Sequence, residues 1–244
     1  MTDRNEILRP DDPVDLSSCE REAIHAPGRI QSFAALLAVS NDWIVTHLSD
    51  NVADILGADT PESLGEPLGN LLGFETVHSL RTEIQMVRAT QSPARLFGMD
   101  IGGKALNISI HAHPTGFIFE FEPESGAAGR DDISTVRNLV ARVSLAEDLD
   151  AFNAAAVRAL KAFCGFDRVM MYKFDEDYTG QVIAEAREGD QESYLGLRYP
   201  ASDIPAQARA LYLRNPIRVL SDTEAVTVGV EPLFDPSGAS LDMS

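Results

Sequence analysis

Apolar and polar positions alternate in several short segments of the first half of the chain. Residues 36–39 and 43–48 are apolar runs separated by an Asn-Asp pair, which predicts two paired strands with a turn between them. Residues 106–110 and 117–121 alternate strictly, which predicts two half-buried strands. Residues 75–90 instead repeat apolar side chains at helical spacing, which predicts an amphipathic helix.

The second half shows longer helical spacing followed by strands. Asp131 is expected to begin one helix, Asp150 to cap a second one, and Gly165 to end it. Residues 168–174 and 181–187 then predict a hairpin.

In the first half, Ser49 is expected to cap a short helix that Gly57 ends.

A segment of small residues, 124–129, is expected to be the linker between two domains. Strands and short helices before and after the linker predict two α+β domains, with an N-terminal arm at 1–22, a first domain at 23–124 and a second domain at 125–244.

The charge excludes some functions. With a net charge of −18, the surface repels phosphates, so nucleic-acid binding and binding to anionic membranes are not expected. The first ten residues are polar and unlike a secretory signal, no apolar run is long enough to span a bilayer, and we expect a cytoplasmic protein. We find no catalytic motif and no residue spacing typical of a metal site, so an enzyme is not expected.

The segment Pro200–Pro205 carries the most information. Two prolines bracket Ser202, Asp203 and Ile204, and a helix-like run follows. Proline is compatible with a helix start, and Ser202 or Asp203 could cap that helix. The segment therefore predicts a rigid elbow that either caps a helix or presents Asp203 as a fixed hydrogen-bond acceptor.

Aromatic and basic residues cluster around this elbow. Tyr172, Tyr194, Tyr199 and Tyr212 are four of the five tyrosines, and they could form either an ordinary core or the wall of a pocket for a flat ligand. Arg209, Arg214 and Arg218 follow, and they are either solvated or a docking site for a carboxylate-bearing ligand.

The two cysteines, Cys19 and Cys164, are far apart and do not predict a disulfide. Cys19 ends the polar arm, where an exposed thiol is either idle or nucleophilic. Cys164 has apolar neighbours, which predicts a small core residue.

Taken together, three segments resemble a known family. Residues 19–31 (CEREAIHAPGRIQ), 165–174 (GFDRVMMYKF) and 200–212 (PASDIPAQARALY) are similar, in this order, to the photosensory module of bacteriophytochromes. The resemblance implies a PAS domain followed by a GAF domain. It also implies biliverdin, a linear tetrapyrrole, in the GAF pocket.

The resemblance assigns roles to individual residues. It implies a thioether between Cys19 and ring A, and contact of the Asp203 carbonyl with the pyrrole N–H groups. Tyr172, Tyr194 and Tyr199 are implied to surround ring D, which light rotates, and Tyr212 and Arg218 to face a propionate. The implied cofactor-binding residues are Cys19, Met170, Tyr172, Tyr194, Tyr199, Ser202, Asp203, Ile204, Pro205, Tyr212 and Arg218.

The resemblance also predicts what lies outside this chain. The chain ends at Ser244, before the family's closing GAF strands, its PHY domain and its histidine kinase region, so we expect an incomplete GAF domain. In the family the N-terminal arm passes through a lasso to form a figure-eight knot, and the full-length proteins are homodimers. Here we expect an open lasso, with residues 223–244 exposed and the arm held less firmly.

Two functions follow as alternatives. The first is a red/far-red photoreceptor module that binds biliverdin covalently. The second is a PAS–GAF signalling or dimerisation module that binds no chromophore in this form.

Overall fold

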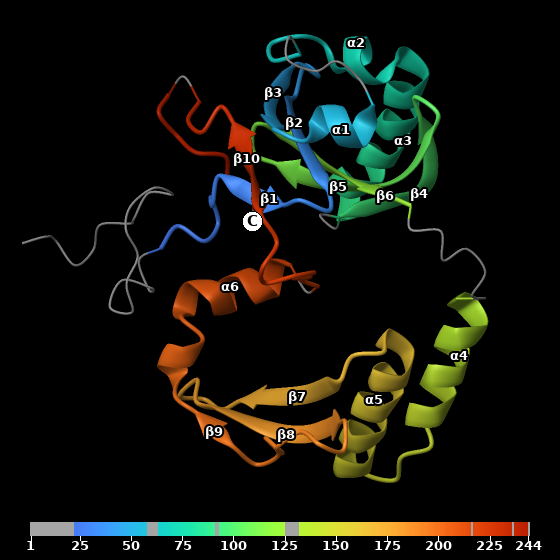
Figure 1. Cartoon of the computed structure of the whole chain (residues 1–244), viewed down its shortest axis with the longest axis vertical. Coiled ribbons are helices and arrows are strands. Elements are labelled where there is room, and N and C mark those ends of the chain that lie inside the picture. The colour runs from blue at the N-terminus through green and yellow to red at the C-terminus, as the bar shows by residue number, and fades with distance from the viewer. Residues whose placement is uncertain are drawn as a thin grey trace, which may run out of the picture. The chain divides into compact units, whose positions relative to one another are not determined.

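The computed structural model of the chain describes residues 22–57, 63–90, 93–124, 132–215, 217–235 and 237–243. The contacts between Cα atoms divide the chain into two compact units (Figure 1). Unit 1 comprises residues 1–126 and 210–244, and unit 2 comprises residues 127–209. The predicted division lies after residue 124, with all later residues in the second domain, whereas residues 210–244 group with unit 1.

Unit 1 is built on a seven-stranded antiparallel sheet. In spatial order the strands are β1 (Arg29–Gln31), β10 (Thr227–Glu231), β3 (Val45–Ser49), β2 (Ala35–Ser40), β6 (Gly116–Pro123), β5 (Lys104–His113) and β4 (Ala94–Ile101). The predicted strand pair at 36–48 is confirmed as β2 and β3, and the alternating segments at 106–110 and 117–121 are confirmed as β5 and β6.

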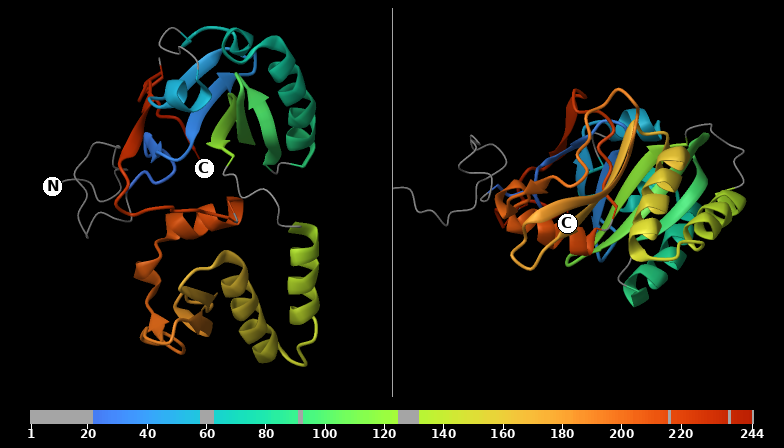
Figure 2. Two further views of the ribbon diagram at one scale, coloured as in Figure 1. Left: turned by 45° about the vertical axis from the view of Figure 1, so that its right-hand side comes forward. Right: turned by 90° about the horizontal axis from the view of Figure 1, so that it is seen from below.

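Three helices cover one face of this sheet. They are α1 (Val52–Leu56), α2 (Leu68–Leu72) and α3 (Phe74–Thr90), and Figure 2 shows α3 lying along the sheet. The predicted apolar stripe of α3 is confirmed, because Val77, Leu80, Ile84 and Val87 are all buried in the main core. Alternate residues of β5 and β6 complete this core, as strand periodicity requires.

The opposite face of the sheet carries a second, smaller core. Leu36, Ala38 and Ile118 pack there against Val230 of β10 and Leu241 near the C-terminal end. The expectation that residues 223–244 are exposed is therefore wrong for this part of the segment, because Val230 and Leu241 are 3% and 8% exposed. Residues 29–31, which follow the expected arm, pair as β1 with β10, whereas residues 1–21 of the arm lie outside the described residues.

Unit 2 has a three-stranded antiparallel sheet of β7 (Arg168–Phe174), β8 (Gly180–Arg187) and β9 (Arg198–Tyr199). Helix α5 (Leu149–Cys164) contacts β7 and β8, and α4 (Asp132–Val143) lies beside α5 (Figure 2). A short 3-10 turn, Ala201–Asp203, follows β9 and leads into α6 (Ala206–Arg214). The predicted hairpin is confirmed, with a register shift between Met171 and Tyr172.

The helix caps differ from the prediction at two positions. Ser49 is the last residue of β3, and Asn51 stands before α1. The cap of α5 is Asp148, whose side chain accepts from the Ala151 N–H at 2.7 Å, and Asp150 lies in the first turn. The C-terminal cap at Gly165 is confirmed by its φ of 71°. The predicted helix start at Asp131 lies outside the described residues.

The prediction for Cys164 is wrong. Its side chain is exposed at the end of α5, where the thiol donates to the Leu160 carbonyl at 2.9 Å. Within the described ranges, no helix is long and apolar enough to cross a bilayer, and no three His, Cys, Asp or Glu side chains gather as metal ligands.

Candidate functional site

Aromatic side chains gather where the three strands of unit 2 meet. The ring centroids of Tyr172 and Phe174 on β7 are 5.1 Å apart in an edge-to-face arrangement. Tyr199 on β9 places its ring 6.1 Å from that of Tyr172. Met170 and Phe174 are 43% and 37% exposed, so this apolar surface is open rather than filled by the unit's own core. An open aromatic wall suits a flat ligand better than it suits a packed interior.

The ring of Tyr172 lies directly over the backbone of β8. A Cβ atom at Gly180 would stand only 1.9 Å from the hydroxyl end of this ring, so the close contact requires glycine at position 180. Burial raises the pKa of Tyr172 above its ordinary value, and the negative charge of Asp203 and the neighbouring Tyr199 raise it further. Tyr172 is therefore neutral at physiological pH and keeps its hydroxyl proton as a donor.

The proline-bracketed elbow is held by Arg209. The guanidinium of Arg209 donates to the carbonyl oxygen of Ala201 at 3.0 Å and to that of Ile204. It also lies over the ring of Tyr178, 4.3 Å from the centroid. These contacts fit neither interpretation of Arg209, because its guanidinium is bound to the protein instead of being solvated or free to dock a carboxylate.

Within this elbow, Asp203 is exposed to solvent and makes one local backbone hydrogen bond. Its N–H donates to the Pro200 carbonyl at 3.1 Å, and Pro200 is itself the N-cap residue of the 3-10 turn. Ser202 and Asp203 are exposed, whereas Ile204 and Pro205 are partly buried. Asp203 therefore places exposed polar groups just before the first turn of α6, and its assignment as a hydrogen-bond acceptor stays a prediction.

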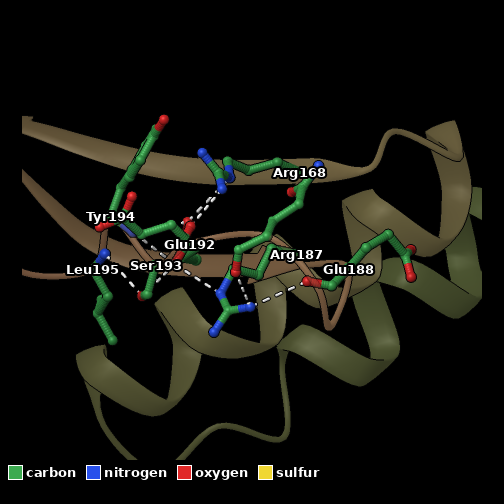
Figure 3. A network of polar contacts seen from close by, with 9 residues as sticks. Arg168, Arg187, Glu188, Glu192, Ser193, Tyr194 and Leu195 are labelled. Carbon is green, nitrogen blue, oxygen red and sulfur yellow. Dashed lines mark hydrogen bonds and ion pairs between the residues drawn. The ribbon is translucent and has the colours of Figure 1, made fainter.

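Tyr194 belongs to a polar network that joins β7, β8 and the loop after β8 (Figure 3). Its ring lies 3.9 Å from the guanidinium of Arg168, and its N–H donates to the Glu185 carboxylate at 3.2 Å. Glu185 also accepts from the Ser193 hydroxyl at 2.7 Å and pairs with Arg168 and Arg187 at 3.3 and 3.7 Å. The backbone of residues 188–195 is thus fixed to β7 and β8.

Glu185 is the centre of this network. Its side chain is only 4% exposed, and burial is the largest influence on its pKa and raises it. The hydrogen bonds from Ser193 and Tyr194 and the charges of Arg168 and Arg187 together outweigh burial, so the pKa of Glu185 lies below its ordinary value. The carboxylate is therefore ionised and holds the loop that carries Tyr194.

Arg168, Glu185 and Arg187 are not among the residues predicted from the sequence. Their grouping depends on the pairing of β7 with β8, in which Arg168 stands opposite Arg187 and Met170 opposite Glu185. The signal in the sequence was an Arg-Glu-Arg set at alternate strand positions, which becomes readable only once the register is known.

The remaining predicted site residues lie elsewhere. Tyr212 and Arg218 belong to unit 1, where both are exposed and the Arg218 guanidinium lies 5.4 Å from the ring centroid of Tyr212. Cys19 lies outside the described residues. In unit 2 the structure brings together Tyr172, Tyr199 and the Asp203 elbow, with Met170 on the same strand as Tyr172 and Tyr194 on the loop after β8.

Comparison with known proteins decides the family. The family model described as a PAS fold matches residues 19–124. The chain is 35% identical over 241 residues to a bacteriophytochrome of Pseudomonas aeruginosa and 36% identical over 247 residues to one of Xanthomonas campestris pv. campestris. Each alignment covers 95% of this chain, and 32% and 37% of the respective relatives.

A solved structure extends this similarity to the whole fold. The crystal structure of the chromophore-binding domain of the Stigmatella aurantiaca bacteriophytochrome is 34% identical, with a TM-score of 0.80, over 93% of this chain and 76% of that chain. The chain belongs to the bacteriophytochrome family. It matches the photosensory region of phytochromes and spans about a third of the length of the curated relatives.

Proposed function

We propose that this bacteriophytochrome chain binds a linear tetrapyrrole against the aromatic wall of unit 2 and works as a red/far-red photoreceptor module. The observation that carries the proposal is the partly exposed group of aromatic rings of Tyr172, Phe174 and Tyr199, close enough to the exposed Asp203 for its charge to act on Tyr172, with exposed Met170 on the same strand. The wall offers apolar area and hydroxyl groups, and Asp203 offers acceptors, which together match a conjugated ligand with pyrrole N–H groups.

The residues that would hold the bilin have distinct tasks. Tyr172 and Tyr199 would form the wall at ring D, with Met170 and Tyr194 nearby, and the Asp203 carbonyl would accept from pyrrole N–H groups. Ser202, Ile204 and Pro205 would fix the elbow, while Tyr212 and Arg218 would face a propionate. Cys19 would attach biliverdin through a thioether. When bound, the bilin supplies red absorption and light-driven rotation of ring D.

Biliverdin titration of the purified chain tests this proposal. We expect a red absorbance band that survives denaturation, because the link is covalent. Cys19→Ala should abolish the covalent fraction and leave reversible binding, whereas Cys164→Ala, which removes an exposed thiol, should retain it. An unchanged biliverdin spectrum with the parent chain would refute the proposal and favour a signalling module without chromophore.

The output of the photoreceptor lies outside these residues. We propose that the full-length protein is a cytoplasmic homodimer whose downstream region is a sensor histidine kinase of a two-component system. The length of the relatives, about three times that of this chain, supports the presence of such further regions.

A further inference from the structure

Arg209 contacts three separate parts of unit 2. Its guanidinium nitrogen Nη1 donates to the carbonyl oxygens of Ala201, at 3.0 Å, and of Ile204, which stand on either side of Asp203. Its own N–H donates to the Pro205 carbonyl at 3.1 Å in the first turn of α6. The guanidinium plane also covers the ring of Tyr178 in the turn between β7 and β8. The side chain of Arg209 on α6 thus joins the elbow to the hairpin turn.

The elbow needs such a donor because of its prolines. Pro200 and Pro205 carry no N–H, so the segment between them has fewer internal donors than carbonyl oxygens. The Asp203 N–H donates to the Pro200 carbonyl, and the Arg209 guanidinium donates to the carbonyls of Ala201 and Ile204. Across the described ranges, neither the carbonyl nor the carboxylate of Asp203 makes a hydrogen bond within the protein.

We infer that Arg209 is a positioning residue for the bilin site. It occupies the carbonyls on both sides of Asp203, so that the Asp203 carbonyl is left to receive the pyrrole N–H groups, at a fixed place relative to Tyr172. This inference rests on the proposed function and adds a residue that contacts the elbow rather than the ligand. It also assigns Tyr178 a role, because the ring supports the guanidinium plane from the hairpin turn.

Arginine is suited to this task. One guanidinium nitrogen carries two N–H groups in a fixed plane, so it can serve two carbonyls at once while its face stacks on a tyrosine. A lysine at this position would keep the charge but lose the planar stacking, and a glutamine would lose the charge and the reach. The contrast between these substitutions separates positioning from simple charge.

Hydrogen exchange of the chain without bilin gives the first test. In Arg209→Gln, the amides of the elbow, above all that of Asp203, which donates to the Pro200 carbonyl, should exchange about tenfold faster, the change expected when one charge-assisted hydrogen bond that holds the elbow is lost. Tyr178→Leu should give a smaller increase at the same amides, and Arg209→Lys should fall between the parent and Arg209→Gln. The matched control is Arg158→Gln, on the exposed side of α5, which should leave these amides unchanged. Unchanged exchange in Arg209→Gln would overturn the inference.

The biliverdin complex gives the second test. In Arg209→Gln, the pH at which the red band is half lost should fall by about one unit, since tenfold weaker stabilisation of the protonated pyrroles corresponds to one unit. Photoconversion should drop alongside it, and Arg158→Gln should match the parent. An unaltered pH profile in Arg209→Gln would overturn the inference.

Biliverdin dimethyl ester distinguishes positioning from direct binding of a carboxylate. A positioning role predicts the same defect of Arg209→Gln with the free acid and with the ester. A defect that disappears with the ester would show that Arg209 docks a propionate and would overturn the inference. If the parent chain takes up no biliverdin, the proposed function fails, while the exchange test still decides whether Arg209 holds the elbow.

Discussion

Replacing Gly180 by alanine tests whether the Tyr172 ring lies where the structure places it. The added Cβ would stand 1.9 Å from the Tyr172 Cζ and hydroxyl oxygen, whereas non-bonded carbon atoms rest about 3.5–4.0 Å apart. The ring end would therefore have to move by about 1.6 Å or more. Phe174 and Tyr199 lie on its flanks with centroids at 5.1 and 6.1 Å, which limits the directions in which it can move.

Two opposing effects set the size of the change. Overpacking of this kind costs about 1–3 kcal/mol. Alanine also lowers the entropy of the unfolded chain, which stabilises by about 0.4–1 kcal/mol where the backbone permits it, as at Gly180, whose φ lies outside the left-handed region. We expect a net loss of about 1–2 kcal/mol in unit 2, equivalent to roughly tenfold faster exchange of the β7 and β8 amides.

The assay includes its own reference. Trp43 is the single tryptophan and lies in unit 1, so its fluorescence transition in urea should stay unchanged while exchange in unit 2 accelerates. Gly189→Ala is the matched control, because a Cβ there meets no atom within 4 Å. In a Tyr172→Leu background, Gly180→Ala should become neutral or stabilising, which a double-mutant cycle measures directly. If Gly180→Ala exchanges no faster than the parent chain, the ring does not occupy the position described.

Two further predictions concern charged and titrating groups. Glu185→Gln should destabilise unit 2 by roughly 2 kcal/mol, because it leaves Arg168 and Arg187 without their buried carboxylate partner. The control Glu192→Gln, on the exposed loop, should not destabilise the unit, and hydrogen exchange of the β8 amides measures both variants. Burial lowers the pKa of His47 below its ordinary value of 6.5, although the charge of Asp235 opposes this shift. Just below pH 6.5 the unfolded chain therefore binds more protons at this histidine than the folded chain does. The unfolding free energy of unit 1, measured by Trp43 fluorescence, should therefore be highest above pH 6.5 and decline as the pH falls, by at most about 1.4 kcal/mol per pH unit. His47→Gln should flatten this decline, whereas the control His78→Gln, at an exposed position, should not.

Local periodicity was sufficient for most elements of both units. The apolar stripe of α3 and the alternation in β5 and β6 each follow from which face must be buried, and the structure buries those faces. The helix starts were less certain because Asp148 and Asp150 both suit a cap, and only the extended backbone of Asp148, at φ −144° and ψ 175°, selects between them. Cys164 was misassigned because its apolar neighbours lie on a helix end that leaves the thiol exposed.

In the candidate site, too, features set by nearby residues could be predicted from the sequence, whereas contacts between distant residues could not. The elbow and the tyrosines could be recognised from residue types and short spacing. The supporting contacts could not, because Arg209 reaches back to carbonyls of the elbow and Arg168 reaches across to the loop at Tyr194. Side-chain to backbone contacts leave no mark in a hydrophobic pattern, and they depend on a register that only the folded chain defines.

The C-terminal segment shows the same limit most clearly, because the strand partner of β10 lies almost the whole chain away. Arg29 donates to the hydroxyl and carbonyl oxygens of Thr227 at 2.7 and 2.8 Å, and Val230 N–H donates to the Gly28 carbonyl at 2.9 Å. The weakly held arm expected from the sequence is therefore replaced by a new prediction, that amides of residues 28–31 are protected from exchange. Val230→Asp should remove this protection, since a charge placed among buried apolar side chains costs about 3 kcal/mol or more. Val226→Asp, at a position 81% exposed, should leave it intact. Rapid exchange of residues 28–31 in the parent chain would show that β1 and β10 do not pair in solution, whereas equal effects of the two variants would trace the protection to overall charge rather than to the buried face of β10.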